Sequence, residues 1–177
     1  MEDKVTNTSS SELSLSRKGY SRQHGLPDDL TNFFILHEGP ISVVDGKMHD
    51  MKYKKLTKKK TVSHLGESGW VGLTDKYWLA SFIPDQSEQY SANYNYAIKA
   101  GRDKYQADFI STSKLIEEGG VYELTHHLFA GAKKVALLDK YESQYDIKLF
   151  DRAIDFGWFY ILTKPIFNAM NFFFLFR

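Results

Sequence analysis

Short segments in which apolar and polar residues alternate fill most of residues 5–129, and they constrain the fold of this 177-residue chain more than any other feature. Alternation with a period of two puts apolar side chains on one face of a β-strand. The clearest segments form two pairs, each joined by a turn signal: 69–73 with 77–83, and 93–99 with 104–110. These pairs predict antiparallel hairpins, with Tyr94, Tyr96 and Ile98 on a buried face.

The remaining patterns predict a sandwich followed by helices. Further short strands are expected at residues 5–8, 13–16, 32–36, 41–44 and 121–129. After Gly131 the apolar period becomes helical, and a helix is expected within residues 133–146. The predicted fold class is therefore mainly β, an antiparallel β-sandwich over residues 1–131 with C-terminal α-helices. One helix, at 132–148, packs on the sandwich, and residues 149–177 form a separate amphipathic region.

Bulk charge gives no support for a nucleic-acid partner, because the formal net charge is only +1. Six lysines nevertheless cluster between residues 51 and 61, at Lys52, Lys54, Lys55, Lys58, Lys59 and Lys60. A solvated loop explains this cluster, and a contact with anionic lipid headgroups is the alternative. Cysteine is absent, which excludes disulfides, thiolate metal sites and a cysteine nucleophile.

The last 27 residues, 151–177, are rich in aromatic and aliphatic side chains and contain one internal lysine before the closing arginine. If residues 149–176 are largely helical, Lys164, Asn168 and Asn171 share one narrow stripe. Three placements are open: a helix lying in the membrane interface, a helix docked on the sheet, or a transmembrane span. The polar stripe and Pro165 favour the interfacial helix. The predicted membrane-interface residues are Trp158, Phe159, Tyr160, Leu162, Lys164, Ile166, Phe167, Met170 and Phe173.

No stretch of the chain has the pattern of a catalytic, cofactor or metal site. The sequence has no nucleophile elbow, phosphate loop, dinucleotide fingerprint or zinc-protease motif. His126 and His127 are expected in one strand, where their side chains point to opposite faces and cannot bind one ion. His37 and Glu38 have no partner at metal spacing. We therefore expect a protein that is not an enzyme and holds no cofactor or metal.

Several segments, taken in this order and at this spacing, resemble the periplasmic domain of the YidC-type membrane protein insertase. The similarity runs from about residue 5 to residue 173. The segments are 33–41 (FFILHEGPI), 69–80 (GWVGLTDKYWLA), 129–134 (FAGAKK), 138–142 (LDKYE) and 155–167 (DFGWFYILTKPIF).

This resemblance implies a β-supersandwich of the sugar-mutarotase type and an amphipathic helix on the outer face of the bacterial inner membrane. It also implies that the protein helps to insert and fold membrane proteins, alone or with the Sec translocon. The implied partners are the lipid bilayer surface, Sec components and nascent membrane proteins. Compared with the family, the first transmembrane helix, half of the periplasmic domain and the membrane core are missing, so a fragment without the insertion core is expected. The alternative is a sugar-binding or mutarotase-like protein, for which His24, His37 and Glu38 are the only candidates.

Overall fold

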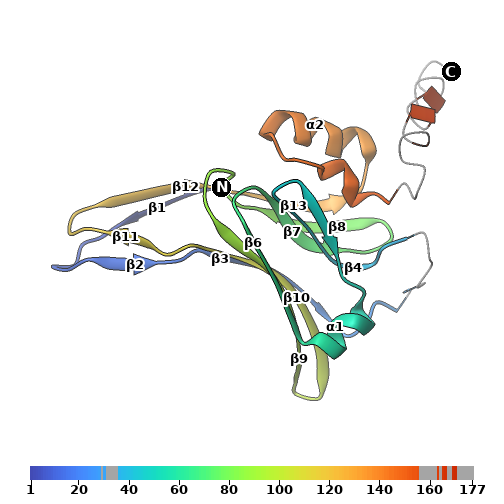
Figure 1. The fold of residues 1–177 in the computed structure, drawn as a ribbon, viewed down its shortest axis with the longest axis horizontal. Helices are drawn as coiled ribbons and strands as arrows, with labels where there is room; N and C mark the ends of the chain where they lie inside the picture. The colour runs from blue at the N-terminus through green and yellow to red at the C-terminus, as the bar shows by residue number, and fades with distance from the viewer. Residues whose placement is uncertain (29, 31–35, 156–162, 164, 167–168, 171–177) are drawn as a thin grey trace.

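The computed structural model describes residues 1–28, 30, 36–155, 163, 165–166 and 169–170, and it forms antiparallel sheets with helices outside them (Figure 1). One sheet has five strands in the order β13-β8-β7-β4-β5. Their bounds are β4 Gly39–Val44, β5 Lys47–Asp50, β7 Gly69–Thr74, β8 Trp78–Ile83 and β13 His127–Ala132. The second sheet has four strands in the order β3-β10-β9-β6. Their bounds are β3 Lys18–His24, β6 Thr61–Gly66, β9 Tyr90–Lys99 and β10 Arg102–Ser111.

The five-stranded sheet is the middle layer of three, because alternate residues of its strands enter different cores. Val44 and Val71 pack with Tyr94 and Phe109 of the four-stranded sheet. Their neighbours Val43 and Trp70 face the opposite side, in a second core completed by the helices α2 (Val135–Tyr145) and η1 (Phe150–Ala153). All six residues of β4 are buried, as expected for a strand covered on both faces. The predicted mainly β sandwich with C-terminal helices is confirmed.

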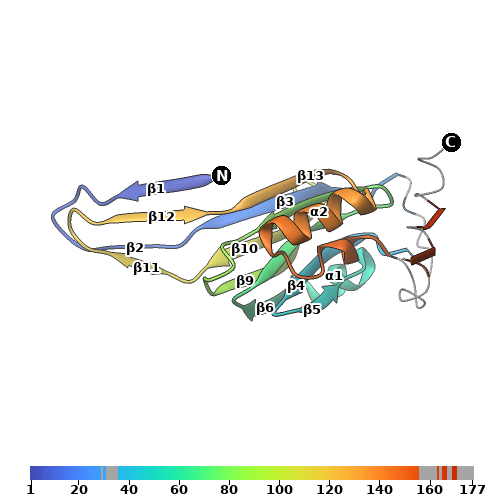
Figure 2. The same cartoon turned by 90° about the horizontal axis from the view of Figure 1, so that it is seen from above.

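Two narrow ribbons extend from the sandwich as an arm at one end of the molecule (Figures 1 and 2). One ribbon pairs β1 (Glu2–Thr6) with β12 (Val121–Thr125), and the other pairs β2 (Leu13–Leu15) with β11 (Lys114–Ile116). Fully buried Asn7 joins them at the tip, since its Nδ2 donates to the carbonyl oxygens of Ser11, Ile116 and Glu117 at 2.8–3.0 Å. This side chain thereby ties together turns that are more than 100 residues apart in the chain.

Both predicted hairpins are confirmed, as β7–β8 and β9–β10. The predicted burial of Ile98 is wrong: its side chain is 65% exposed, whereas Tyr94 is fully buried. Ile98 lies three residues before the Gly101 turn, where the hairpin has run past the opposing sheet. The single strand predicted at 121–129 is also wrong, because it is divided into β12 and β13 at buried His126. The predicted strand at 32–36 falls mainly outside the described residues.

The loop predicted over the lysine cluster is wrong, because Tyr53–Lys59 form the helix α1. Tyr53 and Leu56 are three residues apart, so they lie on one face, and both are buried in the core between the sheets. The ring of Tyr53 packs edge-on against Tyr105, with ring centroids 4.7 Å apart. Two apolar anchors therefore fix a helix whose other residues are mostly lysines.

The α-helix expected from residue 149 does not begin there. Leu149 has a left-handed backbone, and residues Phe150–Ala153 form the short 3₁₀ helix η1. Ile154 is then extended, with φ −93° and ψ 122°. The described residues of the following segment, 163, 165, 166, 169 and 170, are helical.

Candidate functional site

Strand pairing brings three of the sequence motifs to one end of the five-stranded sheet. In the register of β4 with β7, Gly39 lies opposite Thr74, and in the register of β8 with β13, Trp78 lies opposite Ala132. The segment before β4, the β7–β8 turn and the residues after β13 therefore meet at this end. We call this place the sheet-end cluster, formed by His37, Glu38, Thr74, Asp75 and Lys133.

Gly39 is the first residue of β4, and its backbone conformation connects the segment of His37 and Glu38 to the sheet. Its φ is +138°, and a Cβ placed on it would lie 2.6 Å from the carbonyl oxygen of Met51. The backbone N–H of Met51 donates to the carbonyl of Pro40 at 3.0 Å. Only glycine accepts both this backbone conformation and this close approach. The chain before α1 is thereby fixed beside the sheet-end cluster.

Asp75 closes the β7–β8 turn through its own side chain. Its Oδ1 accepts hydrogen bonds from the backbone N–H groups of Tyr77, at 2.9 Å, and Trp78, at 2.6 Å. The backbone N–H of Asp75 donates to the carbonyl of Trp78 at 3.0 Å. Aspartate favours turns for this reason, since its carboxylate satisfies N–H groups that a tight turn leaves without partners.

Lys133, the first residue after β13, links the β7–β8 turn to the end of β13. Its Nζ donates to Thr74 Oγ1 at 2.9 Å and to the carbonyl of Asp75 at 2.5 Å. Its backbone N–H donates to the carbonyl of Tyr77 at 2.8 Å. Burial lowers the pKa of the Lys133 ammonium, while the carboxylates of Asp75, Asp155 and Glu38 act in the opposite direction. The lysine therefore brings positive charge to a place where three carboxylates gather.

His37 and Glu38 form the other side of the sheet-end cluster. Glu38 is 4% exposed, and His37 is half-buried with its Nε2 3.0 Å from the carbonyl of Pro40. His37 Nδ1 lies 3.6 Å from Asp50 Oδ2. Burial lowers the pKa of His37, and the nearby Asp50 carboxylate opposes that shift. His24, the third candidate for a sugar site, is exposed at the end of β3.

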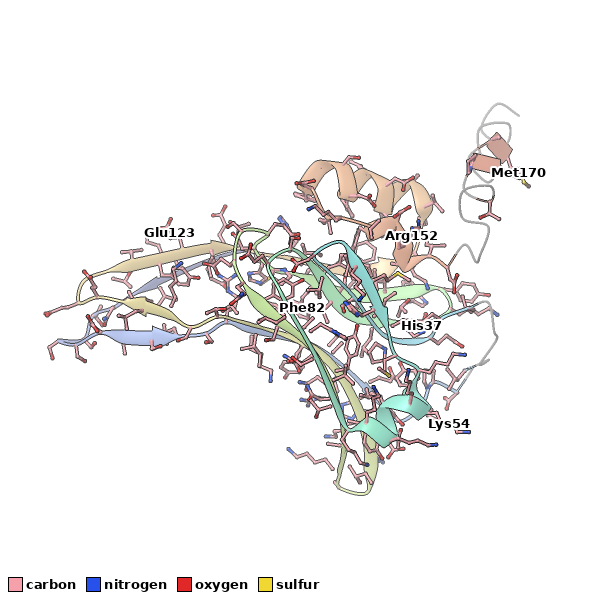
Figure 3. The ribbon with its side chains drawn as sticks, viewed as in Figure 1. His37, Lys54, Phe82, Glu123, Arg152 and Met170 are labelled. Atoms are coloured by element: carbon pink, nitrogen blue, oxygen red, sulfur yellow. The ribbon has the colours of Figure 1, made fainter. Side chains whose placement is uncertain are left out.

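The helices after Lys133 are held on the sheet by an aromatic contact. Phe150 of η1 is fully buried between Trp70 and Phe129, with ring centroids 5.4 and 5.5 Å away and rings nearly perpendicular. Edge-to-face pairs of this kind contribute about 0.5–1.5 kcal/mol each beyond the burial of area. The indole Nε1 of Trp70 also donates to the carbonyl of Lys148 at 3.3 Å. These contacts place η1 on the sheet, and Figure 3 labels Arg152, a residue of η1.

The chain leaves the described sandwich at Asp155, next to the sheet-end cluster. The carboxylate of Asp155 lies close enough to act on the pKa values of both His37 and Lys133. The path from β13 through α2 and η1 thus returns to the cluster where it started.

Only two of the nine predicted membrane-interface residues belong to the described part of the chain. Ile166 and Met170 are 51% and 68% exposed, and both are helical. Their separation of four residues puts them on one face of a helix. The other seven lie outside the described residues: Trp158, Phe159, Tyr160, Leu162, Lys164, Phe167 and Phe173.

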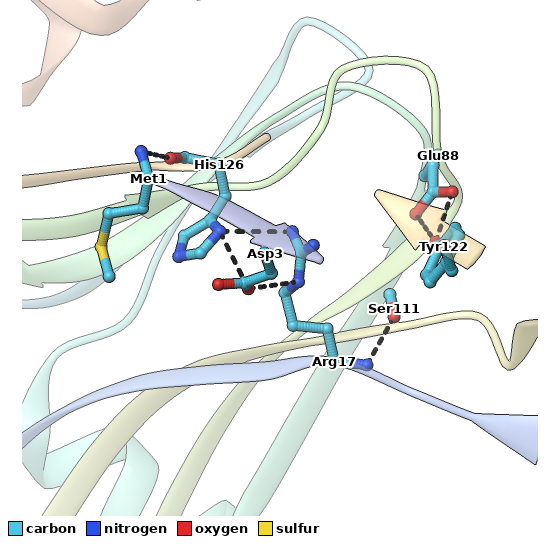
Figure 4. Close-up of polar contacts among 7 residues, drawn as sticks. All are labelled: Met1, Asp3, Arg17, Glu88, Ser111, Tyr122 and His126. Atoms are coloured by element: carbon cyan, nitrogen blue, oxygen red, sulfur yellow. Dashed lines mark hydrogen bonds and ion pairs between the residues drawn. The ribbon is translucent and has the colours of Figure 1, made fainter. Parts of the chain in front are cut away.

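A second polar network lies where the arm joins the sandwich (Figure 4). Asp3 Oδ2 is 3.2 Å from Arg17 Nε and 3.5 Å from His126 Nδ1. Burial, followed by the Arg17 guanidinium, lowers the pKa of His126. His126 thus belongs to a contact between the arm and the body. The sequence carried no signal for this network, because Asp3 and His126 are more than 100 positions apart.

Two further features are absent from the part of the chain that the structure describes. No group of three or more His, Cys, Asp or Glu side chains is arranged to hold a metal ion there. Within the same residues, no helix has the length and apolar character needed to cross a membrane.

The fold defines a class: an antiparallel β-sandwich domain with helices packed on its outer face after the last strand. The sequence matches the YidC periplasmic domain family over residues 1–169. The chain therefore belongs to this family, and the resemblance noted in the sequence is confirmed.

Membrane protein insertases named YidC are among the similar proteins. Those of Rickettsia felis, Rickettsia conorii and Rickettsia bellii are each 49% identical over 176 residues, which is 98% of this chain and 31% of each relative. The chain thus spans about a third of the length of the curated relatives it matches. Neither the family match nor these relatives support the mutarotase-like alternative.

Proposed function

We propose that this chain is the periplasmic part of a bacterial membrane protein insertase, held at the outer face of the inner membrane. Its work is positional and not enzymatic: the sandwich carries the segment that lies on the bilayer. The observation that carries this proposal is the family match over residues 1–169, together with 49% identity to proteins named as membrane protein insertases.

In this proposal the nine membrane-interface residues lie at headgroup depth, with their apolar side chains towards the acyl chains. The exposure of Ile166 and Met170 supports this placement, because each leaves a large apolar surface without a protein neighbour. The sheet-end cluster and the buried ring of Phe150 fix the start of that segment. Emerging membrane proteins and Sec translocon components are the proposed partners of the surface so positioned.

Flotation of the full chain with phosphatidylcholine vesicles tests the membrane placement. Each apolar side chain buried in an interface contributes about 1.5–3 kcal/mol, so Ile166→Glu combined with Met170→Glu should weaken binding at least about 100-fold. The matched control is Leu115→Glu with Leu128→Glu, which places the same charges on exposed leucines of the arm and β13. Equal binding by both double variants would remove the basis for the interfacial segment.

A further inference from the structure

The six lysines around α1 remain outside the proposed function, although they are the strongest charge cluster in the chain. Between residues 51 and 61 there are six lysines and no aspartate or glutamate, while the whole chain has a net charge of only +1. All six side chains are exposed, because the two anchors Tyr53 and Leu56 take up the inward face of the helix. We call this surface the α1 lysine face.

No carboxylate in the described part of the chain forms an ion pair with this face, since no salt bridge there involves any lysine between 52 and 60. Lys54 and Lys58 are four residues apart, as are Lys55 and Lys59, and like charges at that spacing destabilise a helix by about 0.2–0.5 kcal/mol per pair. The helix therefore keeps a repulsion that an external anion would relieve.

The α1 lysine face also has a hollow shape. A surface groove of about 470 Å³ is lined, among the described residues, by Lys52, Lys54, Lys55, Lys58 and Asp50. Lys47 adds to the positive potential nearby, since both it and Lys59 lower the pKa of His64 after burial does. Several ammonium groups thus converge on a space large enough for anionic headgroups.

Helix α1 lies near the sheet-end cluster, towards the same end of the molecule as Met170. The helix starts two residues after Met51, which is hydrogen-bonded to Pro40 beside the sheet-end cluster. Figure 3 shows labelled Lys54 and Met170 towards the same end of the long axis, opposite the arm that carries Glu123.

We propose that the α1 lysine face is a second membrane contact, which binds anionic lipid headgroups at the end of the long axis towards which Met170 also lies. The inference rests on the proposed function for its location at a bilayer. It adds a specificity that the apolar segment lacks, because an aliphatic surface does not distinguish charged from zwitterionic lipid. A basic residue close to an anionic surface contributes about 1 kcal/mol, and the attraction falls off within a Debye length.

The test uses the full chain with two kinds of vesicle, phosphatidylcholine alone and phosphatidylcholine mixed with phosphatidylglycerol. The variant is Lys54→Gln, Lys55→Gln and Lys58→Gln, since glutamine matches the helix propensity of lysine. The control triple, Lys4→Gln, Lys18→Gln and Lys114→Gln, changes the net charge equally at the arm side of the molecule. Circular dichroism confirms that each variant remains folded.

The α1 variant should lose about 100-fold of its partition onto the anionic vesicles and keep its partition onto phosphatidylcholine. The control triple should lose less than about 3-fold, and added salt should abolish the difference between the two. Equal losses, or no loss in the α1 variant, overturn the α1 lysine face as a lipid contact. Failure of the proposed function has a different signature: the Ile166 and Met170 double variant then has no effect on phosphatidylcholine vesicles.

Discussion

The imidazole of His49 stacks on that of His64, with ring centroids 3.7 Å apart and an interplanar angle of 21°. His49 belongs to the edge strand β5 of one sheet and His64 to the edge strand β6 of the other. Tyr94 supports the pair: its ring lies edge-on to His64, and its hydroxyl donates to the carbonyl of His49 at 3.0 Å. This contact joins the open edges of the two sheets.

The stacked pair predicts a loss of stability in mild acid. Burial lowers the pKa of both rings, and Lys47 adds to the shift in each case, while Asp50 opposes it at His49. Unfolded histidine titrates near pH 6.5, so the unfolded chain takes up these protons first as the pH falls. The free energy of unfolding should therefore be highest above about pH 6.5 and fall from there down to the pKa values of the folded rings.

Urea denaturation at about pH 7.5 and about pH 5.5 measures this effect. The double variant His49→Gln with His64→Gln should lose less stability between the two pH values than the unmodified chain. His24→Gln, at an exposed position at the end of β3, is the control and should leave the difference unchanged. An identical pH dependence in all three chains would show that the stacked pair does not contribute.

Lys133 should contribute more to the free energy of unfolding than its neighbour Lys134. Lys133→Met removes the donor to Thr74 Oγ1 and the Asp75 carbonyl and takes a positive charge away from three carboxylates. The loss should be about 1–3 kcal/mol in urea denaturation. Lys134→Met, at an exposed position, should change stability by less than about 0.5 kcal/mol. Similar values for the two variants would mean that the lysine does not hold the sheet end together.

The sequence predicts the parts of this fold in which local pattern and tertiary burial agree. Both hairpins have alternating apolar residues and turn residues, so the two signals point to the same structure. Strand β3 carries few apolar residues, and its alternation of half-buried and exposed positions arises from tertiary contacts, because it pairs with β10 and one of its faces lies against β7 and β8. Helix α1 was missed for a related reason, because two anchors among six lysines are too few to show a helical period.

The sheet-end cluster could be predicted only in part. Its segments were singled out by their resemblance to a family, yet their meeting depends on registers that join residues far apart in sequence. Thr74 and Lys133 are 59 positions apart, and no local pattern pairs them. The pattern of the C-terminal segment alone predicts the membrane-interface residues, and seven of the nine lie outside the described residues.

Alanine should lower the free energy of unfolding much more at Gly69 than at Gly25. Its φ is +131°, and a Cβ on it would lie 1.9 Å from the carbonyl oxygen of Val43, so Gly69→Ala must displace β7 from β4. The loss in the free energy of unfolding should be at least about 3 kcal/mol. Gly25→Ala also places alanine at positive φ, +73°, but meets nothing within 4 Å, so only the backbone cost of about 1–2 kcal/mol applies. Equal losses would show that the close approach to Val43 is not a constraint.

Phe150 should limit the local release of η1 from the sheet. Phe150→Ala opens a cavity between Trp70 and Phe129 and should cost about 3–5 kcal/mol, while Leu128→Ala, at a half-exposed position, should cost less than about 1 kcal/mol. Because η1 then loses its main anchor, trypsin should cut after Arg152 faster, relative to cutting after Lys99 in the β9–β10 hairpin. That ratio separates local release of η1 from global unfolding, which exposes both sites together. A lower stability with an unchanged ratio would mean that Phe150 supports the whole sandwich and does not specifically hold the segment that follows it.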